Sequence, residues 1–114
     1  MTMDKTNERT ARIASFNDAF RTTFRGGRVV MTQGVNALPE MDKVRLFQAV
    51  RAFNSFEPEN DPYAEHDFGL IEQDGARFFF KLDYYDAACC YGSEDPADPS
   101  QTTRVLTIMR AEEY

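Results

Sequence analysis

Residues 66–85 read HDFGLIEQDGARFFFKLDYY, and this stretch decides the fold. Asp74-Gly75 lies at its centre between two runs of alternating apolar residues, a pattern typical of a β-hairpin with a two-residue turn. Such a turn sets which residues of the two strands lie opposite each other. The predicted cross-strand pairs are Glu72 with Arg77, Ile71 with Phe78, and His66 with Asp83.

Alternation along the predicted hairpin assigns its side chains to two faces. The face that we expect in the core carries Ile71, Phe78, Phe80 and Leu82. The second face carries Phe68, Leu70 and Phe79 at its middle. Because this middle is too apolar to stand fully exposed, we expect something to cover it.

Apolar residues at helical spacing predict two helices before the hairpin. The first runs from about Asn7 to Phe24 and ends at Gly26-Gly27, since glycine freely adopts left-handed conformations. Its apolar stripe consists of Ile13, Phe16, Phe20 and Phe24, and the arginines predicted to lie largely off this stripe are Arg9, Arg12, Arg21 and Arg25. The second helix runs from Pro39 to about Asn54, with a stripe of Val44, Phe47, Val50 and Phe53.

Two further strands are predicted at residues 28–32 and 104–110, with a loop at residues 56–63 and a long connection at residues 87–103. The order is therefore helix, strand, helix and then three strands. This order favours an α+β fold, with an antiparallel sheet of about four strands and two helices packed on one face. The length suits a single domain over residues 1–114, in which residues 1–6 form a disordered tail.

Composition excludes several classes of protein. Apolar residues make up 42% of the chain, as in ordinary globular proteins, but no apolar run approaches the ~20 residues that span a bilayer. The N-terminal segment MTMDKTNERTARIA is polar, unlike a secretory signal. Cys89 and Cys90 are adjacent and cannot cross-link distant parts of the chain. We therefore expect a cytoplasmic protein with no membrane partner.

Charge is distributed unequally along the chain. Nine of the 13 basic residues lie in residues 1–55, whereas fourteen of the 19 acidic residues lie in residues 56–114. Such asymmetry favours an acidic surface that attracts basic partners and repels nucleic acid. The alternative is that the two halves fold together and partly neutralise each other.

Polar residues gather at the open end of the hairpin, which is the candidate catalytic or metal site. The candidates are His66, Asp83 and Asp86, with Glu65 or Asp67 as the base. A histidine among carboxylates can ligate a divalent metal or act as a general base. A local hydrogen bond between His66 and Asp83 is the alternative, because no spacing here matches an established zinc or calcium site.

An interaction surface is the other candidate site. Tyrosines beside acidic residues can form aromatic anchors rimmed by charge, and the loop GSEDPADP (residues 92–99) can serve as a docking loop or as a solvated crossover. The candidate partner-binding residues are Asp83, Tyr85, Asp86, Glu94, Asp95 and Asp98. We expect no cofactor, since no phosphate-binding glycine loop and no redox cysteine motif is present.

Several blocks of the chain resemble a known family: GRVVMTQGV, FEPENDPYAEHDFG, FFFKLDYYD and YGSEDPADPSQTTRVLTIMRAEEY. They are similar to the bacterial family called domain of unknown function 3768, and the resemblance runs from about Phe16 to Tyr114. It implies a short bacterial protein, often plasmid-borne, and no catalytic residues to carry over. By analogy with small acidic proteins of mobile elements that block host defence machinery, it favours an inhibitor or DNA-mimic-like binder.

The preferred interpretation is a non-enzymatic protein-interaction module directed at a basic partner, such as a nucleic-acid-handling complex. One alternative is a metal-assisted hydrolase that uses His66, Asp83 and Asp86. The other is a homodimeric structural subunit, in which the second hairpin face is covered by a second copy.

Overall fold

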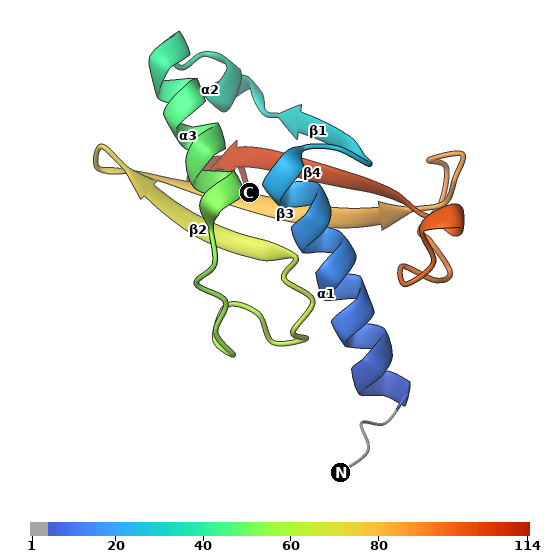
Figure 1. Cartoon of the computed structure of the whole chain (residues 1–114). Coiled ribbons are helices and arrows are strands. Elements are labelled where there is room, and N and C mark those ends of the chain that lie inside the picture. Colours follow the sequence, from blue (N-terminus) through green and yellow to red (C-terminus); the bar gives the residue numbers. More distant parts are fainter. Residues whose placement is uncertain (1–4) are drawn as a thin grey trace.

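The computed structural model describes residues 5–114, and Figure 1 shows the whole chain. The elements in chain order are α1 (Lys5–Thr23), β1 (Arg28–Met31), α2 (Gln33–Asn36), α3 (Glu40–Ala52), β2 (Phe68–Gln73), β3 (Ala76–Tyr85), the 3-10 helix η1 (Pro99–Gln101), β4 (Thr103–Arg110) and the 3-10 helix η2 (Ala111–Glu113). The predicted disordered tail lies outside the described residues for positions 1–4. Lys5 and Thr6, the other two residues of that tail, are assigned to α1.

The four strands form one sheet in the order β1-β4-β3-β2. The pairs β2–β3 and β3–β4 are antiparallel, while β1 lies parallel to β4. The α+β fold is thus confirmed, but the sheet is mixed rather than purely antiparallel. The reason lies in the path of the chain: β1 is separated from β4 by two helices and a hairpin, and such a long crossover permits parallel pairing.

The hairpin has the predicted turn and register. Asp74 and Gly75 both have positive φ angles, 53° and 78°, as a type I′ turn requires. Ile71 pairs with Phe78, and the pairing ends at the start of β2, where Phe68 lies opposite Lys81.

The predicted pairing of His66 with Asp83 is wrong, because His66 lies outside the strand. Its φ angle of 57° turns the backbone away from the extended conformation that a sheet needs. One more backbone hydrogen bond continues the hairpin just before β2 begins. In this bond the amide of Leu82 donates to the carbonyl of Asp67 at 2.8 Å.

The core lies between the sheet and α1 and α3, which cover the same face of the sheet (Figure 1). The sheet contributes the predicted core face of the hairpin together with Leu106 and Ile108 of β4. Side chains that leave water here supply most of the stabilising free energy, at roughly 25 cal/mol per Å² of apolar surface.

Two details of the helix stripes differ from the prediction. In α3 the buried residues are Leu46 and Val50, whereas Val44 is exposed. In α1 the predicted Ile13 and Phe20 are buried, but Arg21 is also buried, at 2% exposure, and does not lie off the stripe. Arg21 is able to enter the core because carbonyl and carboxylate oxygens accept hydrogen bonds from its Nη1 and Nη2 atoms, although its buried Nε has no partner within the described residues.

The opposite face of the sheet, called the outer face below, carries Phe68, Leu70, Phe79 and Met109. The buried residues of α1, α2 and α3 all belong to the core side, so no α-helix within residues 5–114 covers this face. Tyr114 follows η2 and places its ring 5.8 Å from Phe68 and 5.6 Å from Phe79. The predicted cover is thus supplied in part by the C-terminal residue. None of the helices in the described range is both long and apolar enough to cross a membrane.

Candidate functional site

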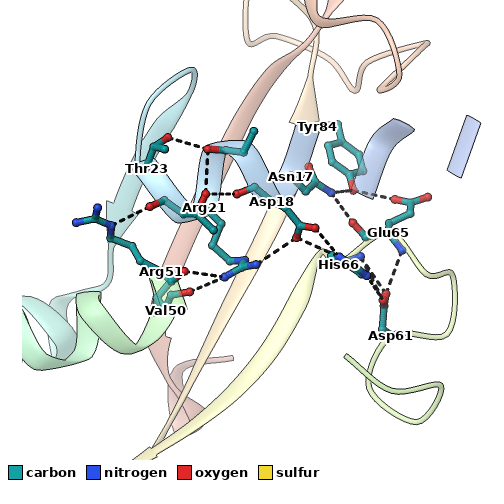
Figure 2. Close-up of polar contacts among 12 residues, drawn as sticks. Asn17, Asp18, Arg21, Thr23, Val50, Arg51, Asp61, Glu65, His66 and Tyr84 are labelled. Atoms are coloured by element: carbon teal, nitrogen blue, oxygen red, sulfur yellow. Dashed lines mark hydrogen bonds and ion pairs between the residues drawn. The ribbon is translucent and has the colours of Figure 1, made fainter. Parts of the chain in front are cut away.

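His66 belongs to the loop that precedes β2, and its ring faces Asp18 of α1 (Figure 2). Its Nδ1 atom lies 2.9 and 3.0 Å from the two carboxylate oxygens of Asp18, and its Nε2 atom lies 3.8 Å from Oδ2 of Asp61. Its ring stacks on Phe56 with a centroid distance of 4.1 Å and an angle of 2°. The imidazole therefore holds the loop against α1.

Asp61 stabilises the conformation of the loop that precedes β2 by hydrogen bonds within that loop. Its side chain is 4% exposed and accepts hydrogen bonds from the backbone amides of Glu65, at 3.1 Å, and His66, at 3.2 Å. These two bonds compensate for the left-handed backbone at His66, which costs a non-glycine residue roughly 1–2 kcal/mol. The position of the imidazole is thus set by a buried carboxylate and not by the register of the sheet.

Asp18 connects His66 to the buried guanidinium group of Arg21. Arg21 donates to Oδ1 of Asp18 at 3.1 Å and to the carbonyl oxygen of Val50 at 2.8 Å (Figure 2). The carbonyl of Val50 belongs to the last turn of α3, where the usual amide four residues ahead is missing, and besides Arg21 it accepts only a long hydrogen bond of 3.4 Å from the amide of Phe53 within the described residues. Arg21 therefore joins α1 to the end of α3, and Asp18 carries this connection on to His66.

A second polar cluster lies beside the first and links α1 to the sheet. Asn17 is fully buried, donates to the hydroxyl of Tyr84 at 2.8 Å and to the carbonyl of Glu65 at 2.9 Å, and accepts from Nε of Arg104 at 2.8 Å. Tyr84 in turn donates to the Glu65 carboxylate at 2.8 Å. Burial raises the pKa of Tyr84 and lowers the pKa of Arg104. The buried Arg104 is satisfied by Asn17 and by the carbonyl of Pro96.

These clusters join α1 to α3, to the loop that precedes β2 and to the sheet. Nδ1 of His66 is within hydrogen-bond distance of Asp18, whereas Nε2 lies 3.8 Å from Asp61, beyond hydrogen-bond reach. A groove of about 540 Å³ runs beside Asp18 and His66, but small side chains of α1 form most of its remaining wall. Within the described part of the chain, no group of three or more His, Cys, Asp or Glu side chains is placed to hold a metal ion.

The sequence-predicted catalytic candidates are not brought together. Asp83 forms an ion pair of 3.2 Å with Lys81 of its own strand, and Asp86 accepts a hydrogen bond of 3.0 Å from the amide of Cys90. His66 meets Asp18 and Asp61 instead, as described above. Within residues 5–114, no hydrogen bond or ion pair links His66 to Asp83 or to Asp86.

The acidic loop uses two of its predicted partner-binding residues for internal contacts. Asp95 pairs with Arg9 of α1 at 3.3 Å, which is a contact between the acidic and the basic halves of the sequence. Asp98 accepts hydrogen bonds from the amide and the hydroxyl of Ser100 at the start of η1, and these bonds lower its pKa. Glu94 is exposed and lines a hollow of about 450 Å³ together with Asp86 and Tyr91.

A larger groove crosses the outer face of the sheet, and we call it the outer groove. It has a volume of about 580 Å³. Its lining consists of Glu59, Asn60, Pro62, Tyr63, Asp67, Phe68, Leu70, Phe79, Lys81, Leu82, Asp83 and Tyr114. Tyr63 and Tyr114 are 74% and 76% exposed, so two aromatic rings of the lining are open to solvent.

Several carboxylates lie in the lining of the outer groove or act on it from nearby. The pKa of Asp67 is raised by burial and by the negative charges of Glu65, Asp61 and Asp83. Lys81 also lines this groove, and its ammonium group forms an ion pair with Asp83. The groove thus combines an apolar floor with an excess of negative charge.

Sequence reasoning missed Asn17, Asp18, Arg21 and Arg104 as members of the polar clusters. One signal was present in α1, because Ile13, Asn17 and Arg21 follow each other at four-residue spacing and lie on one helix face. Polar residues on an apolar stripe indicate buried hydrogen bonds. Asp18 offers no such signal, because its partner His66 lies far away in the sequence.

Comparison with protein families finds a match. The family model described as Protein of unknown function (DUF3768) matches residues 31–113, which confirms for these residues the resemblance seen in the sequence. No curated protein and no solved structure matches the chain.

Proposed function

The chain belongs to the family described as Protein of unknown function (DUF3768), and we propose that it is a non-enzymatic protein-interaction module. Its partner carries a basic surface and docks on the outer face of the sheet, in the outer groove. A nucleic-acid-handling complex, the target expected from the sequence, is one class of partner with such a surface. Binding by this acidic chain would then inhibit the complex.

The single observation that supports this function most is the exposed aromatic lining of the outer groove. Phe68 and Phe79 form its floor, and the open rings of Tyr63 and Tyr114 stand beside them. Tyrosine is enriched among the few residues that dominate binding energy at protein interfaces, and such residues cluster in pockets. Tyr114 packs edge-on against both phenylalanines, which orders one anchor before a partner arrives.

The charge of the groove determines which partner is favoured. Glu59, Asp67 and Asp83 contribute three carboxylates to its lining, against the single cation of Lys81. A basic partner is attracted to such a site, which accelerates association and disfavours acidic competitors. Of the six sequence-predicted binding residues, Asp83 and Tyr85 share the outer face, because they alternate with Leu82 and Tyr84 along β3. The proposed surface therefore lies on the sheet rather than on the acidic loop.

Site-specific photo-crosslinking tests the proposal. The photoreactive residue p-benzoylphenylalanine replaces Tyr63 in one variant, and in the matched control it replaces Met41, which is 70% exposed on α3. Both proteins are irradiated in a lysate of a bacterial host. We expect a specific adduct with a basic protein from position 63 and none from position 41.

The captured protein is then purified and its affinity for the chain measured directly. We expect the double variant Tyr63→Ala/Tyr114→Ala to bind at least about tenfold more weakly than wild type, since each removes an exposed aromatic anchor. Met41→Ala should bind like wild type. Equal affinity for all three proteins, an adduct only from position 41, or an adduct with a second copy of the chain would each contradict the proposal.

A further inference from the structure

We infer that Asp67 is the point at which the outer groove recognises an arginine side chain of the partner. This inference rests on the proposed function, which names the groove, and it adds the chemical group that the groove selects. The evidence for it is the position of the Asp67 carboxylate, which lines the groove together with aromatic side chains and forms no ion pair with a cation within residues 5–114.

Asp67 and Asp83 are the two partly buried carboxylates that line the outer groove, and within residues 5–114 only Asp83 has a cation. Asp67 is only partly exposed, yet among the ion pairs of residues 5–114 none includes it. Asp83 has Lys81, and the third carboxylate of the lining, Glu59, is exposed. A partly buried carboxylate without a counterion retains an unfavourable electrostatic free energy that an incoming cation lowers. The raised pKa of Asp67 is consistent with this lack of compensation.

The walls around Asp67 select the kind of cation. Phe68 and Phe79 lie on the floor of the groove, and the rings of Tyr63 and Tyr114 are open beside them. A guanidinium group is planar and weakly hydrated, so it can stack on such rings while it donates to a carboxylate. An ammonium group is a compact, strongly hydrated charge and makes poorer use of an aromatic wall.

The chain itself uses the same combination elsewhere. The guanidinium carbon of Arg21 lies 5.3 Å from the centroid of the Phe56 ring and 5.6 Å from that of Phe80, while its Nη2 atom donates to Asp18. Arg104 likewise lies over the rings of Phe16 and Tyr84. Both guanidinium groups lie inside the molecule, whereas the outer groove has rings and a carboxylate open to a partner.

Titration with three matched peptides tests the inference. The probes are three pentapeptides with an acetylated N-terminus and an amidated C-terminus. Each carries one leucine and one tyrosine on either side of a central residue. The central residue is arginine, lysine or citrulline. Citrulline has the shape of arginine without its charge. Binding is followed by the amide shifts of the ¹⁵N-labelled protein, which report even millimolar affinity and the place of contact.

We expect the arginine peptide to bind at least fivefold more tightly than the citrulline peptide, with lysine between them, and to shift the amides of β2 and β3. Asp67→Asn should remove the preference for arginine. The control Glu72→Gln makes the same charge change on an exposed residue of β2 outside the groove, and it should keep that preference.

Equal affinity for arginine and citrulline, an unchanged preference in Asp67→Asn, or no shift with any peptide would overturn the inference. The crosslinking experiment separates this failure from failure of the proposed function. A partner captured from position 63, with no role for Asp67, would leave the groove as the docking site and remove only the arginine.

Discussion

Replacement of Asn17 by alanine is the sharpest test of the buried polar network that joins α1 to the sheet. Asn17 is fully buried and makes hydrogen bonds to three groups, of which one is the guanidinium group of Arg104. A hydrogen bond to a charged group contributes about 1.5–3 kcal/mol to stability, and each of the two neutral bonds contributes about 0.5–1.5 kcal/mol. The better helix propensity of alanine offsets at most about 0.7 kcal/mol of this loss.

Asn17→Ala should therefore lower the free energy of unfolding by about 2–5 kcal/mol, a large part of the 5–15 kcal/mol typical of such a domain. Urea denaturation at neutral pH measures this loss. Asn54→Ala is the matched control, because Asn54 is exposed, follows α3 and makes no side-chain hydrogen bond to any residue in the described range 5–114. We expect the control to stay within about 0.5 kcal/mol of wild type.

A double-mutant cycle identifies the source of the loss. In Asn17→Ala the buried guanidinium group of Arg104 loses its hydrogen bond to Asn17. If this loss causes the destabilisation, the double variant Asn17→Ala/Arg104→Met should lose less stability than the sum of the losses of the two single variants. A loss below about 1 kcal/mol for Asn17→Ala, or strict additivity with Arg104→Met, would refute the energetic role given to this network.

Two further predictions concern the C-terminus and the hairpin. Hydrogen bonds from the Thr32 hydroxyl and from two backbone amides lower the pKa of Glu113 in the folded state. The stability that ionised Glu113 contributes is therefore present above its ordinary pKa. This stability is lost as the pH falls through the lower pKa of the folded state. Urea midpoints measured from neutral pH down to about pH 3 should fall less steeply for Glu113→Gln than for wild type, and identical slopes would refute this. A Cβ atom at Gly69 would collide with the ring of Phe80, so Gly69→Ala should destabilise the protein by about 1–3 kcal/mol. The control Gly92→Ala, whose Cβ would meet nothing closer than 3.9 Å, should cost much less in the same denaturation assay, and equal losses would contradict the packing argument.

Local interactions explain why the hairpin could be predicted from the sequence. Asp74-Gly75 imposes its own backbone geometry, and a turn of two residues leaves a single register for the strands on either side. The alternation that follows placed Phe78 and Phe80 in the core and Phe79 on the outer face, as the structure shows. These features depend on neighbours only a few residues apart.

Long-range interactions explain what the sequence did not reveal about the site. His66 leaves the strand because Asp18, on α1 and 48 residues away in the sequence, binds its ring, and because the carboxylate of Asp61, only five residues away, binds its amide once that carboxylate is buried by the fold. Both contacts depend on the folded arrangement of the chain, so extending the hairpin register to His66 placed it wrongly against Asp83. The parallel pairing of β1 with β4 likewise depends on the route of the chain between them.

The outer groove could be predicted only in part. Alternation indicated an apolar second face with Phe68 and Phe79, and the aromatic ring that covers it comes from Tyr114 at the end of the chain. Tyr63 and Asp67 come from the end of a loop whose shape no local pattern specifies. The sequence therefore indicated which residues form the floor of the groove but not which ones form its wall.

Hydrogen–deuterium exchange of the chain, alone and bound to the captured partner, is the most direct test of the docking face. The account predicts slower exchange in β2, in β3 and near Tyr114, with no change along the exposed side of α3. Protection confined to α1 and α3, with unchanged exchange in the hairpin, would show that the partner binds the opposite side of the molecule and would contradict the account.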